Sequence, residues 1–212
     1  MLALVRRTFL TFFALGLVAA AQQWEIGGAA GFGVYRNLGV TNGSLSGTAG
    51  FKPGPLFSVV AGHRPFKLLS GEFRYTFRDS DIKIESGSDK VSFRGDAHAF
   101  HYDLLLHPSG ESKIRPFVAF GGGLKVFRGN EPERAGQPLQ QLAGFREVNE
   151  IKPLLSLGGG VSYSLSRLLR LRVDARDYIT PFPKSVIEPN PRARLNGRLH
   201  DFIVMVGVSA VF

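Results

Sequence analysis

The sequence predicts an all-β protein, an eight-stranded antiparallel up-and-down transmembrane β-barrel that follows a cleaved signal peptide. Three observations lead to this fold class. The chain begins with a segment typical of secretory signals, the segments after it alternate apolar and other residues with a period of two, and the connections between these segments are alternately long and short. A period of two is the pattern of a strand whose two faces meet different surroundings.

Residues 1–21 have the features of a secretory signal peptide. Two arginines supply a positive start, an apolar run rich in Phe and Leu follows, and small residues end it. We expect cleavage between Ala21 and Gln22, which leaves residues 22–212 as one barrel domain. A membrane-anchoring helix is the alternative, but the run is shorter than the ~20 residues of a comfortable span and a Gly-rich segment follows it.

Composition limits the partners and the chemistry. The chain has no cysteine, which excludes disulfides and thiolate chemistry. Its formal charge is +9, or +7 without the two arginines of the signal. A basic balance is often a sign of nucleic-acid binding, but an exported protein meets little nucleic acid. We therefore expect no nucleic-acid partner and, instead, contact with anionic lipid and lipopolysaccharide; an ordinary solvated surface is an equal alternative.

The end of the chain has the clearest strand pattern for a lipid-facing wall. One face of residues 200–212 is wholly apolar, and the chain stops on that face with Phe212. Outer strands of membrane barrels carry such a row and place aromatic residues at the interface. The alternative is the last buried strand of a soluble sandwich. The apolar row consists of Phe202, Val204, Val206, Val208, Ala210 and Phe212.

Seven earlier segments alternate in the same way, and turn signals such as Asn42-Gly43 lie between them. The connections run long, short, long, short, long, short, long, as expected for a barrel with external loops and short periplasmic turns. A soluble barrel would hide the apolar face inside. The seven expected strands lie near residues 24–35, 57–61, 69–78, 99–106, 114–126, 153–163 and 169–176.

The chain resembles the eight-stranded bacterial outer-membrane β-barrel proteins of the OmpA/OmpX type. The signal, the strand that begins at Trp24, residues 169–180 and the end at 208–212 carry the resemblance, which covers the whole mature chain without a specific motif. It implies an outer-membrane barrel that the barrel-assembly machinery inserts by reading the last strand, with Phe212 as the assembly signal. It does not imply one activity.

Charged residues gather on the face opposite the apolar one. The interior of an eight-stranded barrel is only wide enough for side chains, so these charges must pair or be hydrated. We expect an ionic network that closes the lumen, and a structural role or a surface role carried by the loops; a small narrow pore is the alternative. The expected network consists of Glu72, Arg74, His101, Asp103, Arg170, Arg172, Asp174 and Arg176.

The long loops at residues 128–150 and 181–199 are expected outside the cell. Arg192, Arg194 and Arg198 would then lie near lipopolysaccharide phosphates and could bind them by charge-assisted hydrogen bonds. A solvated loop is the alternative. The sequence leaves the loop ligand and the oligomeric state open.

Patterns typical of enzymes are weak in this chain. The glycine clusters at 121–123 and 158–160 precede no Lys-Ser/Thr, so we interpret them as space for large neighbours in a narrow barrel. A lipid-modifying enzyme would need a catalytic triad. Ser92, Asp96 and His98 share one parity, so on a single strand they would lie on the same face. Strand neighbours two apart lie ~7 Å from one another, which we expect to prevent direct hydrogen bonds.

No cofactor or metal is expected either. His98 and His101 are three residues apart, so on a strand they point to opposite faces and cannot bind one ion together. The prediction is therefore a barrel that is not an enzyme.

Overall fold

The computed structural model describes residues 23–109, 112–130 and 137–212. The expected signal peptide, with Ala21 and Gln22 at its cleavage site, lies outside the described residues. All regular elements of the described part are strands. The described residues include no helix that is long and apolar enough to span a bilayer.

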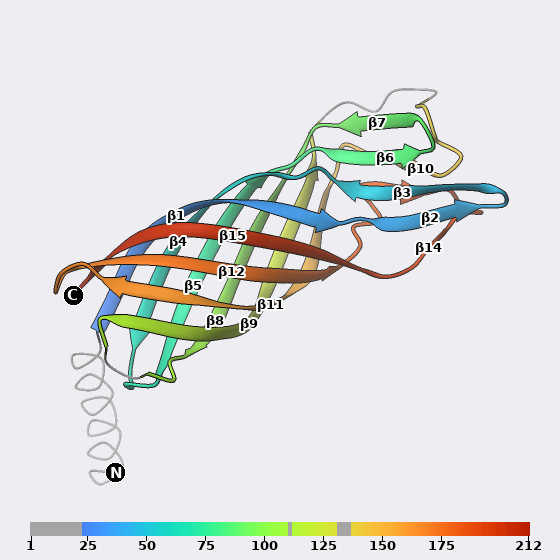
Figure 1. Cartoon of the computed structure of the whole chain (residues 1–212). Coiled ribbons are helices and arrows are strands. Elements are labelled where there is room, and N and C mark those ends of the chain that lie inside the picture. The colour runs from blue at the N-terminus through green and yellow to red at the C-terminus, as the bar shows by residue number, and fades with distance from the viewer. Residues whose placement is uncertain (1–22, 110–111, 131–136) are drawn as a thin grey trace, which may run out of the picture.

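Eight strands form a closed antiparallel barrel, in which each strand pairs with the next and the last pairs with the first (Figure 1). All eight predicted strands are present, so the predicted fold class is confirmed. In chain order they are β1 (Gln23–Arg36), β4 (Gly54–Arg64), β5 (Leu69–Asp79), β8 (Gly95–Leu106), β9 (Ile114–Gly129), β11 (Asn149–Ser164), β12 (Leu169–Pro181) and β15 (Arg198–Val211).

The two ends of the barrel wall meet at one rim. The Trp24 amide donates to the Phe212 carbonyl at 2.8 Å, and the Phe212 amide donates to the Trp24 carbonyl at 3.0 Å. The short connections at residues 65–68 and 165–168, and the described residues of the third at 107–109 and 112–113, lie at this same rim (Figure 1). In membrane barrels the rim with the short turns and both chain ends is the periplasmic one.

The apolar faces of the strands point outward. Phe73 is 63% exposed, whereas its neighbours Glu72 and Arg74 are 2% and 3% exposed. The same inversion recurs on β15, where Phe202 and Val204 are half exposed and Ile203 is buried. A soluble barrel has the opposite arrangement, so the soluble alternative is excluded and the outer surface fits the hydrocarbon of a bilayer.

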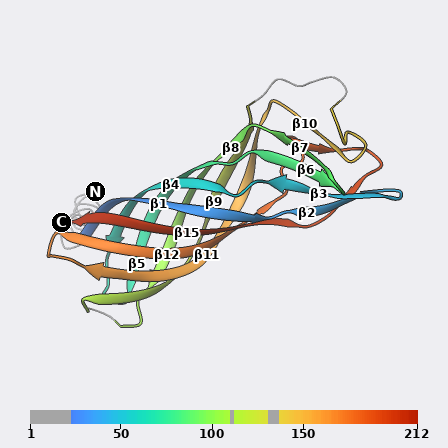
Figure 2. The ribbon, with the colours of Figure 1, turned by 45° about the horizontal axis from the view of Figure 1, so that its top comes forward.

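The sequence predicted plain loops for the long connections, and this prediction is wrong. They contain seven further strands, which extend beyond the barrel rim (Figures 1 and 2) and form a five-stranded sheet, in the order β14-β2-β3-β6-β7, and the pair β10-β13. We call these strands the extension. They are β2 (Leu38–Asn42), β3 (Leu45–Phe51), β6 (Ile82–Ser86), β7 (Asp89–Phe93), β10 (Ala143–Phe145), β13 (Ile187–Pro189) and β14 (Arg194–Leu195).

The extension has an apolar core of its own. Ile82, Ile84 and Leu142 have no exposed surface. The first two lie between the predicted strands at residues 69–78 and 99–106, where no strand was expected. A tight turn forms one residue beyond the predicted Asn42-Gly43 position: Asn42 pairs with Leu45, Gly43 and Ser44 form the turn, and Gly43 has a φ of 60°, a conformation that glycine adopts without strain.

Aromatic rings join this core to the barrel mouth. The ring of Phe51 on β3 lies 4.9 Å from that of Tyr35 on β1 and 5.2 Å from that of Phe127 on β9. All three side chains are buried. The outer end of the lumen is therefore filled by apolar contacts between barrel and extension.

Candidate functional site

A layer of charged side chains crosses the middle of the lumen. On β5 and β8, Glu72 lies directly opposite Asp103 in the register. Two carboxylates in that position repel one another unless cations lie between them. Strand β12 supplies those cations from across the barrel, because alternate residues of each strand point inward.

The first contacts of this layer centre on Glu72. Its Oε1 accepts from Arg74 Nη2 at 3.0 Å and from Arg176 Nη2 at 2.7 Å, and Arg172 also donates to this carboxylate. Arg176 in addition contacts Asp103. The Glu72 carboxylate is thus shared by three guanidinium groups and is 2% exposed.

Asp174 completes the layer. Its Oδ2 accepts from Arg74 Nη2 at 2.9 Å and forms an ion pair with Arg172, whose Nε lies 2.8 Å away. Three carboxylates thereby face three guanidinium groups, and the formal charges of the layer balance. We call this layer the middle network; its charged members are Glu72, Arg74, Asp103, Arg172, Asp174 and Arg176.

His101 belongs to the same layer through hydrogen bonds. Its Nδ1 lies 3.0 Å from Asp103 Oδ1, and its Nε2 lies 2.7 Å from the hydroxyl of Tyr178. The sequence analysis missed Tyr178, which shares the inward parity of Asp174 and Arg176 and could have been found from it. The buried carboxylates therefore have both ionic and neutral partners, which a charged interior requires.

One expectation about strand neighbours is wrong. Residues two apart were expected to lie too far apart for direct hydrogen bonds, yet His101 Nδ1 and Asp103 Oδ1 are hydrogen-bonded at 3.0 Å. Glu72 and Arg74 form a similar pair. The ~7 Å spacing applies to the main chain, and long side chains that lean along the strand close it.

Arg170 lies apart from the middle network. It pairs with Glu25 of β1, whose Oε1 also accepts from the Ser209 hydroxyl at 2.6 Å. Glu25 was not among the predicted lumen residues. Glu25 has the opposite parity to Trp24 on the same strand, and this parity indicated that its side chain points inward.

A second ionic group lies near the outer end of the lumen. Asp201 of β15 pairs with Arg78 and accepts from Lys125 Nζ at 2.7 Å. Both cations also lie over the ring of Tyr35, at 4.1 Å and 4.8 Å from its centroid. Phe51 packs on the same ring. This second ionic group therefore lies directly against the aromatic side chains that fill the outer end of the lumen.

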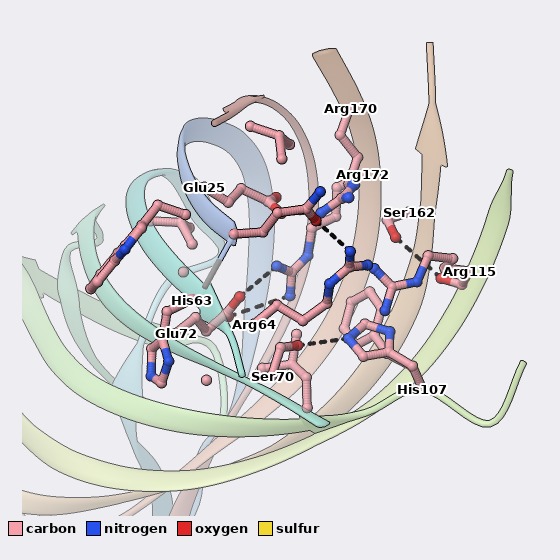
Figure 3. Close-up of a pocket in the computed structure, with 18 residues that line it drawn as sticks. Glu25, His63, Arg64, Ser70, Glu72, His107, Arg115, Ser162, Arg170 and Arg172 are labelled. Atoms are coloured by element: carbon pink, nitrogen blue, oxygen red, sulfur yellow. Dashed lines mark hydrogen bonds and ion pairs between the residues drawn. The ribbon is translucent and has the colours of Figure 1, made fainter. Parts of the chain in front are cut away.

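A small cavity lies on the other side of the middle network, toward the rim with the short turns (Figure 3). Its volume is about 40 Å³, enough for about three waters. Ser70 and His107, whose Oγ and Nε2 are 2.7 Å apart, line one side of it. Glu72 and Arg172 belong both to its lining and to the middle network, so the network bounds the cavity on its inner side.

The glycine clusters provide space for the charged layer. A Cβ at Gly121 would collide with the main chain and carboxylate of Asp103, and one at Gly158 would collide with Arg176. The interpretation of these glycines as space for large neighbours is confirmed at both positions.

The candidate hydrolase residues lie on different strands. Ser92 lies on β7 in the extension, where it pairs with Lys83, whereas Asp96 and His98 lie on the outer face of β8. His98 Nδ1 lies 2.8 Å from the hydroxyl of Tyr75. Within the described ranges, no three His, Cys, Asp or Glu side chains are grouped as ligands of a metal ion.

The three arginines of the last long connection lie on three elements. Arg198 begins β15 opposite Pro181, Arg194 on β14 faces Thr41, and Arg192 lies in the preceding turn. All three are exposed. Their contact with lipopolysaccharide stays a prediction, as does the assembly role of Phe212, which is 66% exposed at the other rim.

Comparison with known proteins finds relatives in structure only. No protein-family model matches the sequence, and no curated protein matches it. Among solved structures, the outer-membrane protein OprG of Pseudomonas aeruginosa has a TM-score of 0.55 at 13% identity, covering 91% of this chain and 96% of that one. Neisserial surface protein A has a TM-score of 0.54 at 13% identity, covering 89% and 96%.

A major outer-membrane protein of Thermus thermophilus is similar at a TM-score of 0.52 and 16% identity, covering 91% of this chain and all of that one. Identities this low establish the fold and nothing finer. The matched structures and the outward apolar surface together support the expected location in an outer membrane. The chain has the fold of the eight-stranded outer-membrane β-barrels, as its resemblance to them implied.

Proposed function

We propose that this protein is an outer-membrane barrel with a closed lumen, that it is not an enzyme, and that it acts through its extension in a structural or surface-interaction role. The observation that carries the proposal is the filling of the lumen. The middle network crosses it, and Phe51 and Phe127 fill its outer end. An ion that passed through would have to separate buried pairs such as Arg74–Asp174 and then cross an apolar layer.

The extension is the part of the molecule that barrel closure does not require. A barrel of this size closes with short loops as well as with long ones, yet here the long connections form two sheets around a shared apolar core. Ordering these residues costs conformational entropy that the buried core must offset. An ordered surface of this kind supports a role in contact with other molecules, and bilayer lipid and lipopolysaccharide are the partners expected at its base.

Two measurements test the proposal. In planar bilayers the unmodified protein should give little steady conductance; a stable, ion-selective current would refute the closed lumen. In the variant Ile84→Asp, a buried charge should unfold the extension, while the barrel keeps its heat-dependent gel mobility. Surface phenotypes of a deletion strain should return with the unmodified gene and not with this variant. Full rescue by Ile84→Asp would exclude the extension as the acting part.

A small pore is the second candidate. The small cavity lined by Ser70 and Arg172 favours it, because it leaves room for water on the turn side of the middle network. The conductance measurement separates the two candidates.

A further inference from the structure

The outer end of the extension has a polar hollow of about 430 Å³, a volume within the ~300–1,000 Å³ range of small-ligand pockets. Three connections that are far apart in the sequence meet there: the end of β2, the turn before β10 and the turn after β13. The β2–β3 hairpin lies at the end of the molecule opposite to the rim with the short turns (Figure 1). We call this site the amide hollow; its lining residues are Asn42, Gln141, Asn190, Pro191 and Arg192.

Hydrogen bonds between these connections fix the frame of the amide hollow. Asn42 Nδ2 donates to the Gln141 carbonyl at 2.7 Å, and the main-chain amide of Asn190 donates to the Leu142 carbonyl at 3.0 Å. Asn190 Oδ1 accepts from the main-chain amide of Arg192 at 3.1 Å. The lining is therefore ordered before a ligand arrives, which lowers the entropic cost of binding.

The turn that carries Gln141 has a strained main chain. Leu139 has a φ of 62°, and it is the one residue other than glycine with a positive φ in the part of the chain that the structure describes. Its carbonyl accepts from the main-chain amides of Leu142 at 2.8 Å and Ala143 at 3.2 Å, and its side chain packs against the apolar core of the extension. A bulky residue keeps this conformation only where its surroundings impose it, so the core sets the position of the turn.

Two side chains of the lining have polar groups available for a ligand. Within the described residues, neither the Gln141 side-chain amide nor the Arg192 guanidinium has a hydrogen-bond or ion-pair partner, and both side chains are exposed. A side-chain amide offers donors and acceptors, whereas a guanidinium offers donors only. None of the five lining residues is acidic. The amide hollow therefore suits a ligand with hydroxyl groups and an anionic group, and it does not suit a metal ion or a basic peptide.

The surface of the extension lacks the apolar anchors of a protein interface. Such interfaces centre on aromatic and large apolar side chains that become buried. Among the described residues, every strongly exposed large apolar side chain lies on the barrel wall, in the short turns or at the chain end, and none lies in the extension. A polar ligand therefore fits this surface better than a protein partner does.

We propose that the amide hollow binds a saccharide that carries an acidic group. Sugar hydroxyls donate and accept hydrogen bonds, as the side-chain amides of the lining do. A carboxylate or phosphate on the sugar pairs with Arg192 by charge-assisted hydrogen bonds, and Pro191 supplies an apolar ring against which the carbon face of a sugar can lie. This ligand class deepens the surface role proposed for the extension and rests on it.

The test uses the full mature barrel, refolded in zwitterionic bicelles, and measures binding by calorimetry. The probes are trigalacturonate, which is an acidic saccharide, maltotriose, which is a neutral one, and inorganic phosphate, which is an anion without a sugar. We expect saturable binding of trigalacturonate below ~10 mM and binding of the other two that is about tenfold weaker or more.

The variant Gln141→Ala/Arg192→Gln should weaken trigalacturonate binding about tenfold, because a neutral and a charge-assisted hydrogen bond are lost. The matched control, Gln140→Ala/Arg194→Gln, changes the same residue types at exposed positions outside the lining and should change the affinity by less than about twofold. Limited proteolysis reports whether the extension stays folded in both variants.

Absence of saturable trigalacturonate binding below ~10 mM would overturn the site, as would equal weakening in the control. Equal affinity for maltotriose or for inorganic phosphate would overturn the acidic saccharide as the ligand. Lipopolysaccharide of the same bacterium, added to the bicelles, distinguishes the source: displacement of trigalacturonate identifies the sugars of the cell's own surface, and unchanged binding identifies a saccharide from outside. The proposed function is tested by conductance and by rescue of a deletion strain, so the two proposals can fail separately.

Discussion

Replacing Glu72 with alanine removes the carboxylate that three arginines share. In the unmodified protein Arg74, Arg172 and Arg176 all contact it, and the side chain is 2% exposed. In the variant the same three guanidinium groups face only Asp103 and Asp174. The middle network then carries one uncompensated positive charge in a place that bulk water does not reach.

The expected loss follows from this surplus. Breaking a buried pair from one side costs ~3–5 kcal/mol, because the remaining charge stays buried. Three contacts are lost at once, which argues for the upper part of that range. The adjoining cavity of about 40 Å³ works in the other direction, since its waters can move toward the freed arginines. We therefore expect the free energy of unfolding to fall by about 3 kcal/mol.

The measurement is urea-driven unfolding of the barrel in phospholipid vesicles. Trp24, the only tryptophan, lies on the barrel wall at the turn rim and reports unfolding by fluorescence. The double variant Glu72→Ala/Arg172→Ala should recover part of the loss because it restores the balance of charges. The matched control is Glu188→Ala, whose pair with Arg146 is about half exposed and should contribute less than ~1 kcal/mol.

Conductance gives an independent measure of the same variant. Loosening the middle network should raise the steady current of Glu72→Ala above that of the unmodified barrel. A Glu72→Ala barrel within ~1 kcal/mol of the unmodified one would refute the reasoning. In that case hydration, rather than pairing, would satisfy the interior charges.

Three further predictions concern other parts of the chain. Phe212→Asp should lower the amount of assembled barrel in outer-membrane fractions, because a charge on the lipid-facing row costs up to a few kcal/mol; normal levels would contradict this. Protease added to intact cells should cut residues 181–199 before residues 107–113, and the reverse order would invert the topology. The hydrogen bond from Lys83 holds the pKa of Glu85 below its ordinary value, so this contribution to stability is present at neutral pH and is lost as the pH falls through that pKa; an NMR titration of Lys83→Met should show the Glu85 pKa rising.

The barrel was predictable because its signal is repeated. Most wall strands alternate over eight or more residues of the sequence, and the lengths of the connections alternate as well, so eight weak patterns support one another. Register then follows from parity, since a shift by one residue would turn the outward Phe73 inward and bury it among charges.

The extension was not predictable by the same means. Its strands are 2–7 residues long, too short for a periodic signal, and they pair over long separations, as Arg194 with Thr41. The alternation of Ile82 and Ile84 with Lys83 was present in the sequence. This short alternation predicts a strand only if a partner strand is known. The partner is β3, and no local sequence pattern specifies that pairing.

The charged residues of the lumen were also predictable only in part. Parity placed Arg74, Asp174 and Arg176 inside, but it could not say which carboxylate each would reach, because partners across a barrel depend on stagger as well as on parity. Glu25 and Asp201 have the inward parity but lie near the ends of their strands, and they were not among the predicted lumen residues.

The lumen is closed differently at its two ends. At the outer end, the surplus cation beside Asp201 lies against aromatic rings, which stabilise it without admitting water. On the turn side, the middle network borders a cavity of about 40 Å³, which has room for water beside its charged side chains. Arg172 lies between the two regions, more exposed than Arg74 and Arg176 and bound to Glu72. Removal of Glu72 should therefore free Arg172 on the side that borders the cavity, where water reaches it more easily than it reaches the aromatic end.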